Sequence, residues 1–265
     1  MSTSVRQMYR PVSLHLAIAP PVSVVIPAMN EEANLPYVFK SLPDWIHEVV
    51  LVDGNSTDRT VEVARELRPD VKIIPQTGKG KGSALISGFE AATGEIIVCI
   101  DADGSADGEE ILTFVSALVA GADFAKGSRF AEGGDTEDMT PIRKLGNAVL
   151  TALVNRKFGA RYSDLCYGYN AFWKRCLEGM ALDCNGFEVE TLMNIRVAQA
   201  RLKVQEIPSK EFKRIHGTSN LRAVRDGLRV LRVILREKRS RRLRMQGRPA
   251  ETLAAAAAEP SRRAS

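Results

Sequence analysis

Short apolar runs alternate with polar, helix-like stretches along the first half of the chain. Apolar runs occupy residues 22–27, 48–53, 71–75 and 95–100, and a fifth, less regular one lies within 122–130. Continuous apolar runs of this length are typical of strands that are buried on both faces. Strands that alternate with helices predict an α/β fold with a mostly parallel central sheet and helices on both faces.

The segments between these runs carry helix boundary signals. Ser56, Thr57 or Asp58 is the expected N-terminal cap of the helix that follows the second run. The glycine-rich stretch 78–82 leads into another helical pattern, and Gly94 is its expected C-terminal cap.

Three of the predicted strands end in acidic or amide side chains. These are Asn30, Glu31 and Glu32 after the first strand, Asp53 at the end of the second, and Asp101 and Asp103 after the fourth. The carboxyl ends of parallel strands lie at one edge of the sheet, where ligands bind. A polar turn would explain any one of these ends, but three together favour a site. Asp101 and Asp103 are spaced to hold Mg²⁺ or Mn²⁺.

The loop over residues 78–82 has the composition of a phosphate-binding loop. Its glycines allow close backbone approach, and Lys79 and Lys81 are available to an anion. Ser83 stands where a dinucleotide fingerprint needs its third glycine, and neither lysine is followed by the Ser or Thr of a P-loop. A mobile surface loop is the alternative. Carboxylates and phosphate together suit a reaction with a diphosphate leaving group, which a hard cation bridges.

Four sequence blocks, in this order, carry a family resemblance: VVIPAMNEEANL, VVLVDGNSTDRT, GKGSALISGF and IIVCIDADG. The chain resembles family 2 glycosyltransferases of the GT-A fold over residues 22–220, closest to the polyprenyl-phosphate (dolichyl-phosphate mannose synthase-like) branch. The resemblance implies a UDP- or GDP-sugar donor. After the fourth block the branch usually continues with Leu and Gln-x-Pro, whereas residues 104–107 are Gly-Ser-Ala-Asp here.

The resemblance also assigns roles to individual residues. It implies Pro27, Asn30, Glu31 and Asp53 in the nucleoside pocket, Lys81 beside the donor phosphates, and Asp101 and Asp103 as the metal-binding Asp-x-Asp motif.

Further candidates lie in the second half of the chain. The family places an acidic residue near the acceptor, where this chain has Glu188 and Glu190; a helix N-terminal acid is the alternative for Glu190. The segment KRIHGTSN resembles the Arg-x-x-Gly-x-Ser segment that folds over the donor diphosphate. The resemblance implies that Arg214 binds phosphate and that Ser219 is the serine of the motif. His216 could be a metal ligand, a hydrogen-bond donor to phosphate or a surface residue. Asp164 opens a segment that resembles a strand of the branch, and a simple turn residue is its alternative.

The net charge of +5 is unevenly distributed. Residues 221–248 contain eleven Lys or Arg against two acids, whereas residues 1–220 carry a net charge of −4. Apolar residues in 221–235 recur at intervals of three and four, which predicts a basic amphipathic helix. Such a helix is typical of binding to an anionic membrane surface; a helix packed on the domain with a solvated basic face is the alternative. Nucleic acid is not an expected partner, because no aromatic residues are interleaved with the basic ones.

The expected organisation has four parts. These are a disordered N-terminus over 1–19, the GT-A domain over 20–220, the basic helix over 221–248 and a low-complexity disordered tail over 249–265. The four cysteines form no Cys-x-x-Cys pair, so we expect neither a zinc site nor disulfides, and a reducing cytosol fits. No apolar stretch approaches the ~18 residues that a membrane-spanning helix needs.

The family resemblance implies a metal-dependent inverting hexosyltransferase with a polyprenyl phosphate as acceptor, and together with the basic helix and the absence of a membrane-spanning stretch it leads us to expect an enzyme that is peripheral at the cytoplasmic face of the membrane. A lipid phosphate is already an anion and needs no general base, whereas a hydroxyl acceptor does. One alternative is therefore a hydroxyl of a soluble or cell-envelope acceptor, with Glu188 or Glu190 as the base. Another is a catalytically degenerate module that only binds nucleotide sugars.

Overall fold

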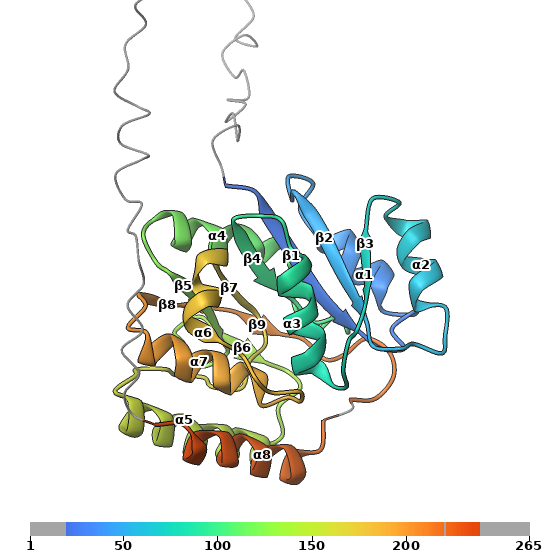
Figure 1. The fold of residues 1–265 in the computed structure, drawn as a ribbon. Coiled ribbons are helices and arrows are strands. Elements are labelled where there is room, and N and C mark those ends of the chain that lie inside the picture. The colour runs from blue at the N-terminus through green and yellow to red at the C-terminus, as the bar shows by residue number, and fades with distance from the viewer. Residues whose placement is uncertain (1–19, 220, 239–265) are drawn as a thin grey trace, which may run out of the picture.

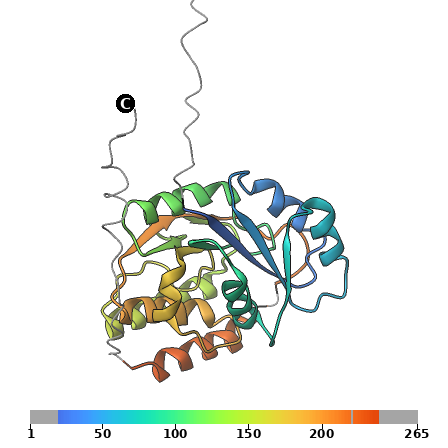
Figure 2. The ribbon, with the colours of Figure 1, turned by 45° about the horizontal axis from the view of Figure 1, so that its top comes forward.

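The five apolar runs of the sequence form five strands of a seven-stranded sheet in the computed structural model, which describes residues 20–219 and 221–238 (Figures 1 and 2). In chain order its strands are β1 (Val22–Ala28), β2 (Glu48–Asp53), β3 (Lys72–Pro75), β4 (Ile96–Cys99), β5 (Phe124–Ser128), β7 (Asn170–Trp173) and β8 (Val204–Pro208). Their order across the sheet is β3-β2-β1-β4-β7-β5-β8. Only β7 runs antiparallel to its neighbours, β4 and β5. The predicted α/β fold with a mostly parallel sheet is confirmed.

Helices cover both faces of this sheet. α1 (Leu35–Ser41), α2 (Thr60–Leu67) and α4 (Ile111–Val119) contribute to the core on one face, and α3 (Lys81–Ala91) and α7 (Val189–Gln199) to the core on the other. Successive residues of β1 point to opposite faces, so Val24 enters the first core and Val25 the second. Burial on both sides explains why the strands appear in the sequence as continuous apolar runs.

An outer helical layer lies beyond α7. It contains α5 (Pro141–Phe158) and α8 (Ala223–Arg236), which pack against each other and against α7, while the short α6 (Leu177–Met180) also contacts α7. Figure 1 shows α5 and α8 side by side below α7. α8 buries Val230, Val233 and Ile234, so the packed helix that we considered as the alternative for this segment is present.

Two further strands form a small ladder of their own. β6 (Asp135–Thr136) pairs in parallel with β9 (Lys210–Glu211), and short 3-10 turns span Gly108–Glu110 and Lys174–Cys176. Residues 239–248 of the predicted basic helix lie outside the described residues, as do the expected disordered ends at 1–19 and 249–265.

Two predicted helix boundaries differ from the structure. The prediction for Gly94 was wrong: α3 ends at Ala91, and its C-terminal cap is Ala92 in an extended conformation. Gly94 instead lets β1 approach closely, since a Cβ there would lie 2.7 Å from the carbonyl oxygen of Pro21. The N-cap residue of α2 is Arg59 and not one of the three residues that we predicted. The Asp58 carboxylate nevertheless accepts a 3.0 Å hydrogen bond from the amide of Thr60, the first residue of the helix, as the side chain of an N-cap residue does.

Candidate functional site

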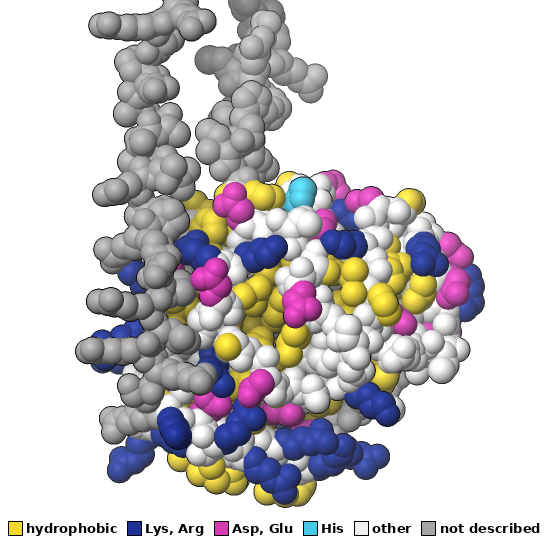
Figure 3. All heavy atoms as spheres, viewed as in Figure 1, with side chains coloured by type: hydrophobic (Ala, Val, Ile, Leu, Met, Phe, Trp, Pro, Cys, Tyr) yellow, Lys and Arg dark blue, Asp and Glu magenta, His cyan; other side chains and the backbone are white. Residues whose placement is uncertain are grey.

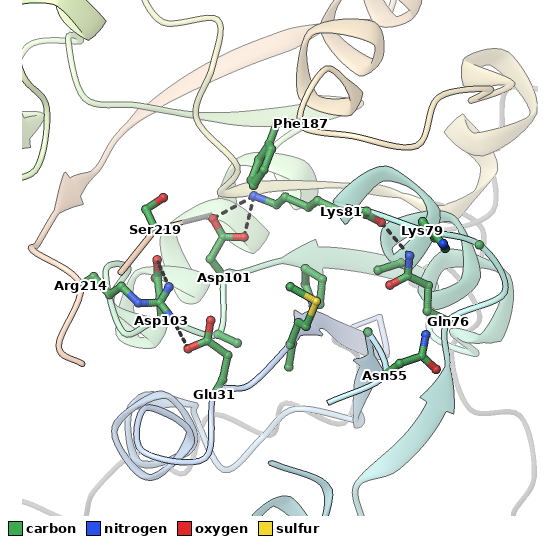
Figure 4. Close-up of a pocket in the computed structure, with 18 residues that line it drawn as sticks. Glu31, Asn55, Gln76, Lys79, Lys81, Asp101, Asp103, Phe187, Arg214 and Ser219 are labelled. Carbon is green, nitrogen blue, oxygen red and sulfur yellow. Dashed lines mark hydrogen bonds and ion pairs between the residues drawn. The ribbon is translucent and has the colours of Figure 1, made fainter. Parts of the chain in front are cut away.

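A pocket of ≈ 450 Å³ opens at the carboxyl ends of β1, β2 and β4, beside the N-terminus of α3 (Figure 4). Most of the residues that the sequence singled out line it: Pro27, Glu31, Lys81, Asp101, Asp103, Arg214 and Ser219. The strand ends converge because β1 pairs in parallel with both β2 and β4. The last two of these residues come from the segment 212–219, which we call the strap.

Asp101 belongs to a buried charge cluster with Lys81 and Glu190. The Lys81 Nζ lies 2.7 Å from the Asp101 carboxylate and 2.6 Å from Glu190 Oε1. Burial alone would lower the pKa of Lys81, but the two carboxylates outweigh it and raise this pKa well above its ordinary value. Lys81 is therefore a fixed positive charge on the floor of the pocket.

Gly168 makes room for this cluster. A Cβ at Gly168 would lie 2.8 Å from both Glu190 Oε1 and Lys81 Nζ, and 3.1 Å from Asp101 Oδ2. The backbone between Asp164 and β7 thus packs directly against the cluster at Gly168. No pattern in the sequence indicated a role for Gly168.

Asp103 is paired with the strap. The Arg214 guanidinium lies 3.4 Å from Asp103 Oδ2 and 2.5 Å from Glu31 Oε2, and Glu31 also accepts a hydrogen bond from Asn34. Burial raises the pKa of Glu31, while its hydrogen bonds to Arg214 and Asn34 act against that rise. Lys81 and Arg214 thus reach the two aspartates from opposite sides of the pocket (Figure 4).

The two aspartates fit a hard divalent cation. They come from one turn, line the same pocket and offer carboxylate oxygens, which Mg²⁺ and Mn²⁺ prefer. Within residues 20–219 and 221–238, no group of three or more His, Cys, Asp or Glu side chains is placed to hold a metal ion. Two carboxylates with the remaining positions left to donor phosphates and water are the usual arrangement for Mg²⁺.

His216 lies apart from the two aspartates. Its ring sits 5.7 Å from that of Tyr37 on α1, and its backbone bonds twice to the Asn34 side chain. It is not among the residues that line the pocket. Its role as a metal ligand stays a prediction, without support from this geometry.

Asn30 and Asp53 also lie outside the pocket lining. The Asn30 side chain accepts a 2.8 Å hydrogen bond from the Thr57 amide, and the Asp53 carboxylate accepts from the Ser56 amide. These bonds shape the loops after β1 and β2. Donor binding by either residue remains a prediction.

Glu188 and Glu190 have different surroundings. Glu190 is held by the ion pair with Lys81. Glu188 stands at the N-cap position of α7 without a capping bond from its side chain, and its Oε1 accepts a hydrogen bond from the Gly186 amide at 3.2 Å. The other carboxylate oxygen of Glu188 is buried and has no hydrogen-bond partner among the described residues. Phe187, which directly precedes Glu188, lines the pocket, and the Lys81 Nζ lies 6.0 Å from its ring centroid.

Asp164 is a structural partner of Arg129. The Arg129 guanidinium lies 2.7 Å from the fully buried Asp164 carboxylate and 2.9 Å from Glu211, which directly precedes the strap. Burial would raise the pKa of Asp164, but the hydrogen bonds and charge of Arg129 outweigh it and lower this pKa. Asp164 thus anchors the base of the strap and does not act as a turn residue alone.

Three further lining residues were missed by the sequence reading: Asn55, Gln76 and Phe187. Gln76 directly follows β3 and Asn55 lies two residues after β2, so the strand-end rule that found Asp101 applies to them too. Phe187 carries no such signal, because its place depends on how α7 packs.

Comparison with known proteins agrees with this geometry. Residues 23–179 match the family described as glycosyl transferase family 2. The chain is 36% identical over 210 residues to a dolichol-phosphate mannosyltransferase from Pyrococcus furiosus. The aligned region covers 76% of this chain but only 59% of the length of that relative. The chain is 32% identical over 215 residues to a polyprenol monophosphomannose synthase from Mycolicibacterium smegmatis, covering 75% of this chain and 80% of the relative.

A solved structure supports the fold. Glucosyl-3-phosphoglycerate synthase from Mycobacterium tuberculosis, in complex with Mn²⁺, UDP and glucosyl-3-phosphoglycerate, matches with a TM-score of 0.66 and 23% identity over 82% of this chain and 79% of that one. The predicted GT-A fold is confirmed, and so is the resemblance seen in the four sequence blocks. The chain belongs to glycosyl transferase family 2.

Proposed function

We propose that the protein transfers a hexose from a UDP- or GDP-sugar to a polyprenyl phosphate at a membrane surface, with Mg²⁺ or Mn²⁺. The observation that supports this proposal is the pocket in which two carboxylates, Asp101 and Asp103, lie beside two positively charged side chains, Lys81 and Arg214. This acceptor class is supported by the names of two relatives, a dolichol-phosphate mannosyltransferase and a polyprenol monophosphomannose synthase. A divalent cation and a nucleotide donor are supported by the Mn²⁺ and UDP that are bound in the matched structure.

In the proposed reaction an oxygen of the lipid phosphate attacks the anomeric carbon of the sugar. The bond from that carbon to the donor diphosphate breaks, and the nucleoside diphosphate leaves with the electron pair. A single displacement of this kind inverts the anomeric centre. Arg214, on the strap, is placed to bind diphosphate oxygens; a divalent cation on Asp101 and Asp103, when bound, supplies charge that stabilises the leaving group.

The surroundings of the two glutamates favour a phosphate acceptor over a hydroxyl. A hydroxyl needs a base within hydrogen-bond reach. Glu190 is engaged by Lys81 at 2.6 Å, and Glu188 lies outside the pocket lining, where its carboxylate accepts a hydrogen bond from the Gly186 amide. A phosphate acceptor needs neither carboxylate as a base.

The exposed side of the outer helical layer supports a membrane location. Its large exposed apolar residues are Ile142, Leu145 and Val149 on α5 and Val224, Leu228 and Leu235 on α8. The α8 groove around Leu228 is lined by Arg222, Arg225, Arg229 and Arg232. Figure 3 shows a band of Lys and Arg across the lower part of the molecule, with apolar side chains at its lower rim. No helix among the described residues is long and apolar enough to cross a membrane.

The test is an assay of the purified protein with Mn²⁺, UDP- and GDP-sugars, and either a short-chain polyprenyl phosphate or the corresponding polyprenol. A glycosylated polyprenyl phosphate, identified by mass spectrometry, is the expected product. Glu190→Gln should keep measurable turnover, whereas loss of a general base costs about 10²- to 10⁴-fold. Product from the polyprenol alone would favour the hydroxyl alternative, and donor binding without any product would favour the degenerate module.

A further inference from the structure

The two cations that meet the Asp-x-Asp carboxylates differ in how firmly they are held. Lys81 starts α3 and is fixed between Asp101 and the buried Glu190. Arg214 belongs to the strap, in which residues 215–219 are exposed. Of the two positive charges, Arg214 is therefore the one that can leave its carboxylates without opening the core.

The strap docks directly on the Asp-x-Asp turn. The Phe212 amide donates to the Ser105 carbonyl at 2.8 Å, and the Ile215 amide donates to the Asp103 carbonyl at 3.2 Å. Gly104, between those carbonyls, has a φ of +75°, and a Cβ on it would lie 2.5 Å from Ile215 Cδ1. Glycine at this position, where the chain departs from the usual pattern of its branch, lets the Ile215 side chain lie flat on the turn.

This docking couples the position of Arg214 to the charge on the turn. The guanidinium lies 3.4 Å from Asp103 Oδ2, while Asp103 Oδ1 accepts from the Ser105 amide at 3.0 Å. A divalent cation on Asp103 would face the Arg214 charge at close range and at low solvent exposure, where like charges repel strongly. The Arg214 guanidinium would then keep Glu31 as its carboxylate partner, and a donor diphosphate in the same pocket would offer it a second anion in place of Asp103.

We propose that Arg214 competes with the divalent cation for Asp103, so that the cation alone binds weakly and the nucleotide diphosphate, by taking over Arg214, strengthens cation binding. The coupling is reciprocal: the cation strengthens nucleotide binding by the same factor. The second half of this inference rests on the proposed function, because it needs a diphosphate in the pocket. The first half concerns only Arg214, Asp103 and the cation.

The experiment measures Mn²⁺ binding to the full chain by electron paramagnetic resonance, with and without UDP or GDP and without any sugar or acceptor. Arg214→Gln should bind Mn²⁺ alone about five- to tenfold more tightly than the natural protein, as expected for removal of one charged hydrogen-bonded competitor. The enhancement of Mn²⁺ binding by nucleotide should shrink in this variant. Arg214→Lys keeps the charge and should stay close to the natural protein.

Two further variants separate this effect from simpler ones. Lys213→Gln removes an exposed charge from the neighbouring position of the strap and should leave Mn²⁺ affinity unchanged. Ile215→Ala loosens the docking on Gly104 without a change in charge and should raise Mn²⁺ affinity in the same direction as Arg214→Gln, but less. A merely structural role of Arg214 would instead lower the affinities for Mn²⁺ and nucleotide together.

An unchanged or weaker Mn²⁺ affinity in Arg214→Gln overturns the inference, as does an equal gain in Lys213→Gln. Thermal unfolding of each variant identifies a misfolded one, and Ile215→Ala then decides the question. Failure of the proposed function appears differently: Mn²⁺ binding would respond to Arg214→Gln as expected, but no sugar would reach a polyprenyl phosphate.

Discussion

Lys81 Nζ and Glu190 Oε1 lie 2.6 Å apart, although 109 positions separate the two residues in the sequence. One starts the helix that follows the glycine-rich loop, and the other lies in the first turn of α7. Their ion pair joins the half of the chain that carries the Asp-x-Asp turn to the half that carries the strap.

We expect Lys81→Met to lower the free energy of unfolding by about 3–5 kcal/mol, because it leaves the Glu190 carboxylate buried and unpaired. Glu190→Gln should cost less, since its amide oxygen still accepts a hydrogen bond from Lys81. Urea unfolding of both variants measures the difference. Equal losses in the two variants would show that the buried charge of Glu190 is not the decisive cost.

We expect Asp103→Asn to lose most turnover and to fold normally. Its carboxylate is one of the two available to the divalent cation, while its partly exposed pair with Arg214 contributes at most about 1 kcal/mol to stability. Steady-state rates across a Mn²⁺ titration, together with thermal unfolding, test both parts. Full activity of the natural protein in excess chelator would contradict the metal requirement itself.

The sequence predicted the parts of the fold whose signals are local. β1, β2 and β4 are almost entirely buried, so each appears as an apolar run, and the pocket lies where these three strands end in polar residues. β7 was indicated only by the family resemblance. It has four residues and enters the sheet between β4 and β5 in the antiparallel direction, which no local pattern specifies.

The contacts that organise the site could not be predicted either, because no local sequence pattern specifies them. Arg214 was expected near phosphate, but its pairs with Glu31 and Asp103 bridge more than 100 positions of sequence. Gly168 has no conformational signal of its own; its small size matters only because Lys81 and Glu190 pack against it. Such relationships are set by tertiary packing, whereas the strand ends are set by local patterns.

We expect Asp164→Asn to destabilise the protein at neutral pH by about 3 kcal/mol, because Arg129 would lose the more deeply buried of its two carboxylate partners and keep only Glu211. Arg129 lowers the pKa of Asp164 in the folded state, so the stability that this carboxylate contributes is present above its unfolded pKa. It is lost as the pH falls through the lower, folded value. The difference between the natural protein and the variant should therefore shrink in strong acid, below the ordinary value of 3.8.

Urea unfolding at pH 7 and at progressively lower pH measures this difference. Asp138→Asn is the matched control, because Asp138 also pairs with an arginine, Arg143, but at a solvent-exposed position. It should cost less than about 1 kcal/mol. A cost for Asp164→Asn that stays constant down to the acid transition would contradict the role of its charge.

The last prediction concerns the exposed side of α5 and α8, and it needs point variants. Removal of α8 would uncover the core that Val230, Val233 and Ile234 help to bury, so a truncated chain would report on folding as well as on membrane binding. Arg225→Gln with Arg232→Gln removes two exposed charges and leaves that buried side intact. We expect this double variant to sediment less with anionic vesicles, because each basic residue near such a surface contributes about 1 kcal/mol.

Ile142→Ser with Leu145→Ser should also weaken vesicle binding, but without a change in its salt dependence, since these residues contribute apolar area and no charge. Arg59→Gln with Arg65→Gln, on α2, removes the same number of charges from a different part of the surface and is the control. If the control variant lost as much vesicle binding as the α8 variant, the effect would depend on the net charge of the protein and not on the position of the charges on α8. Recovery of the natural protein in the supernatant at low salt would contradict a membrane-bound enzyme, and a soluble acceptor would then be the better hypothesis.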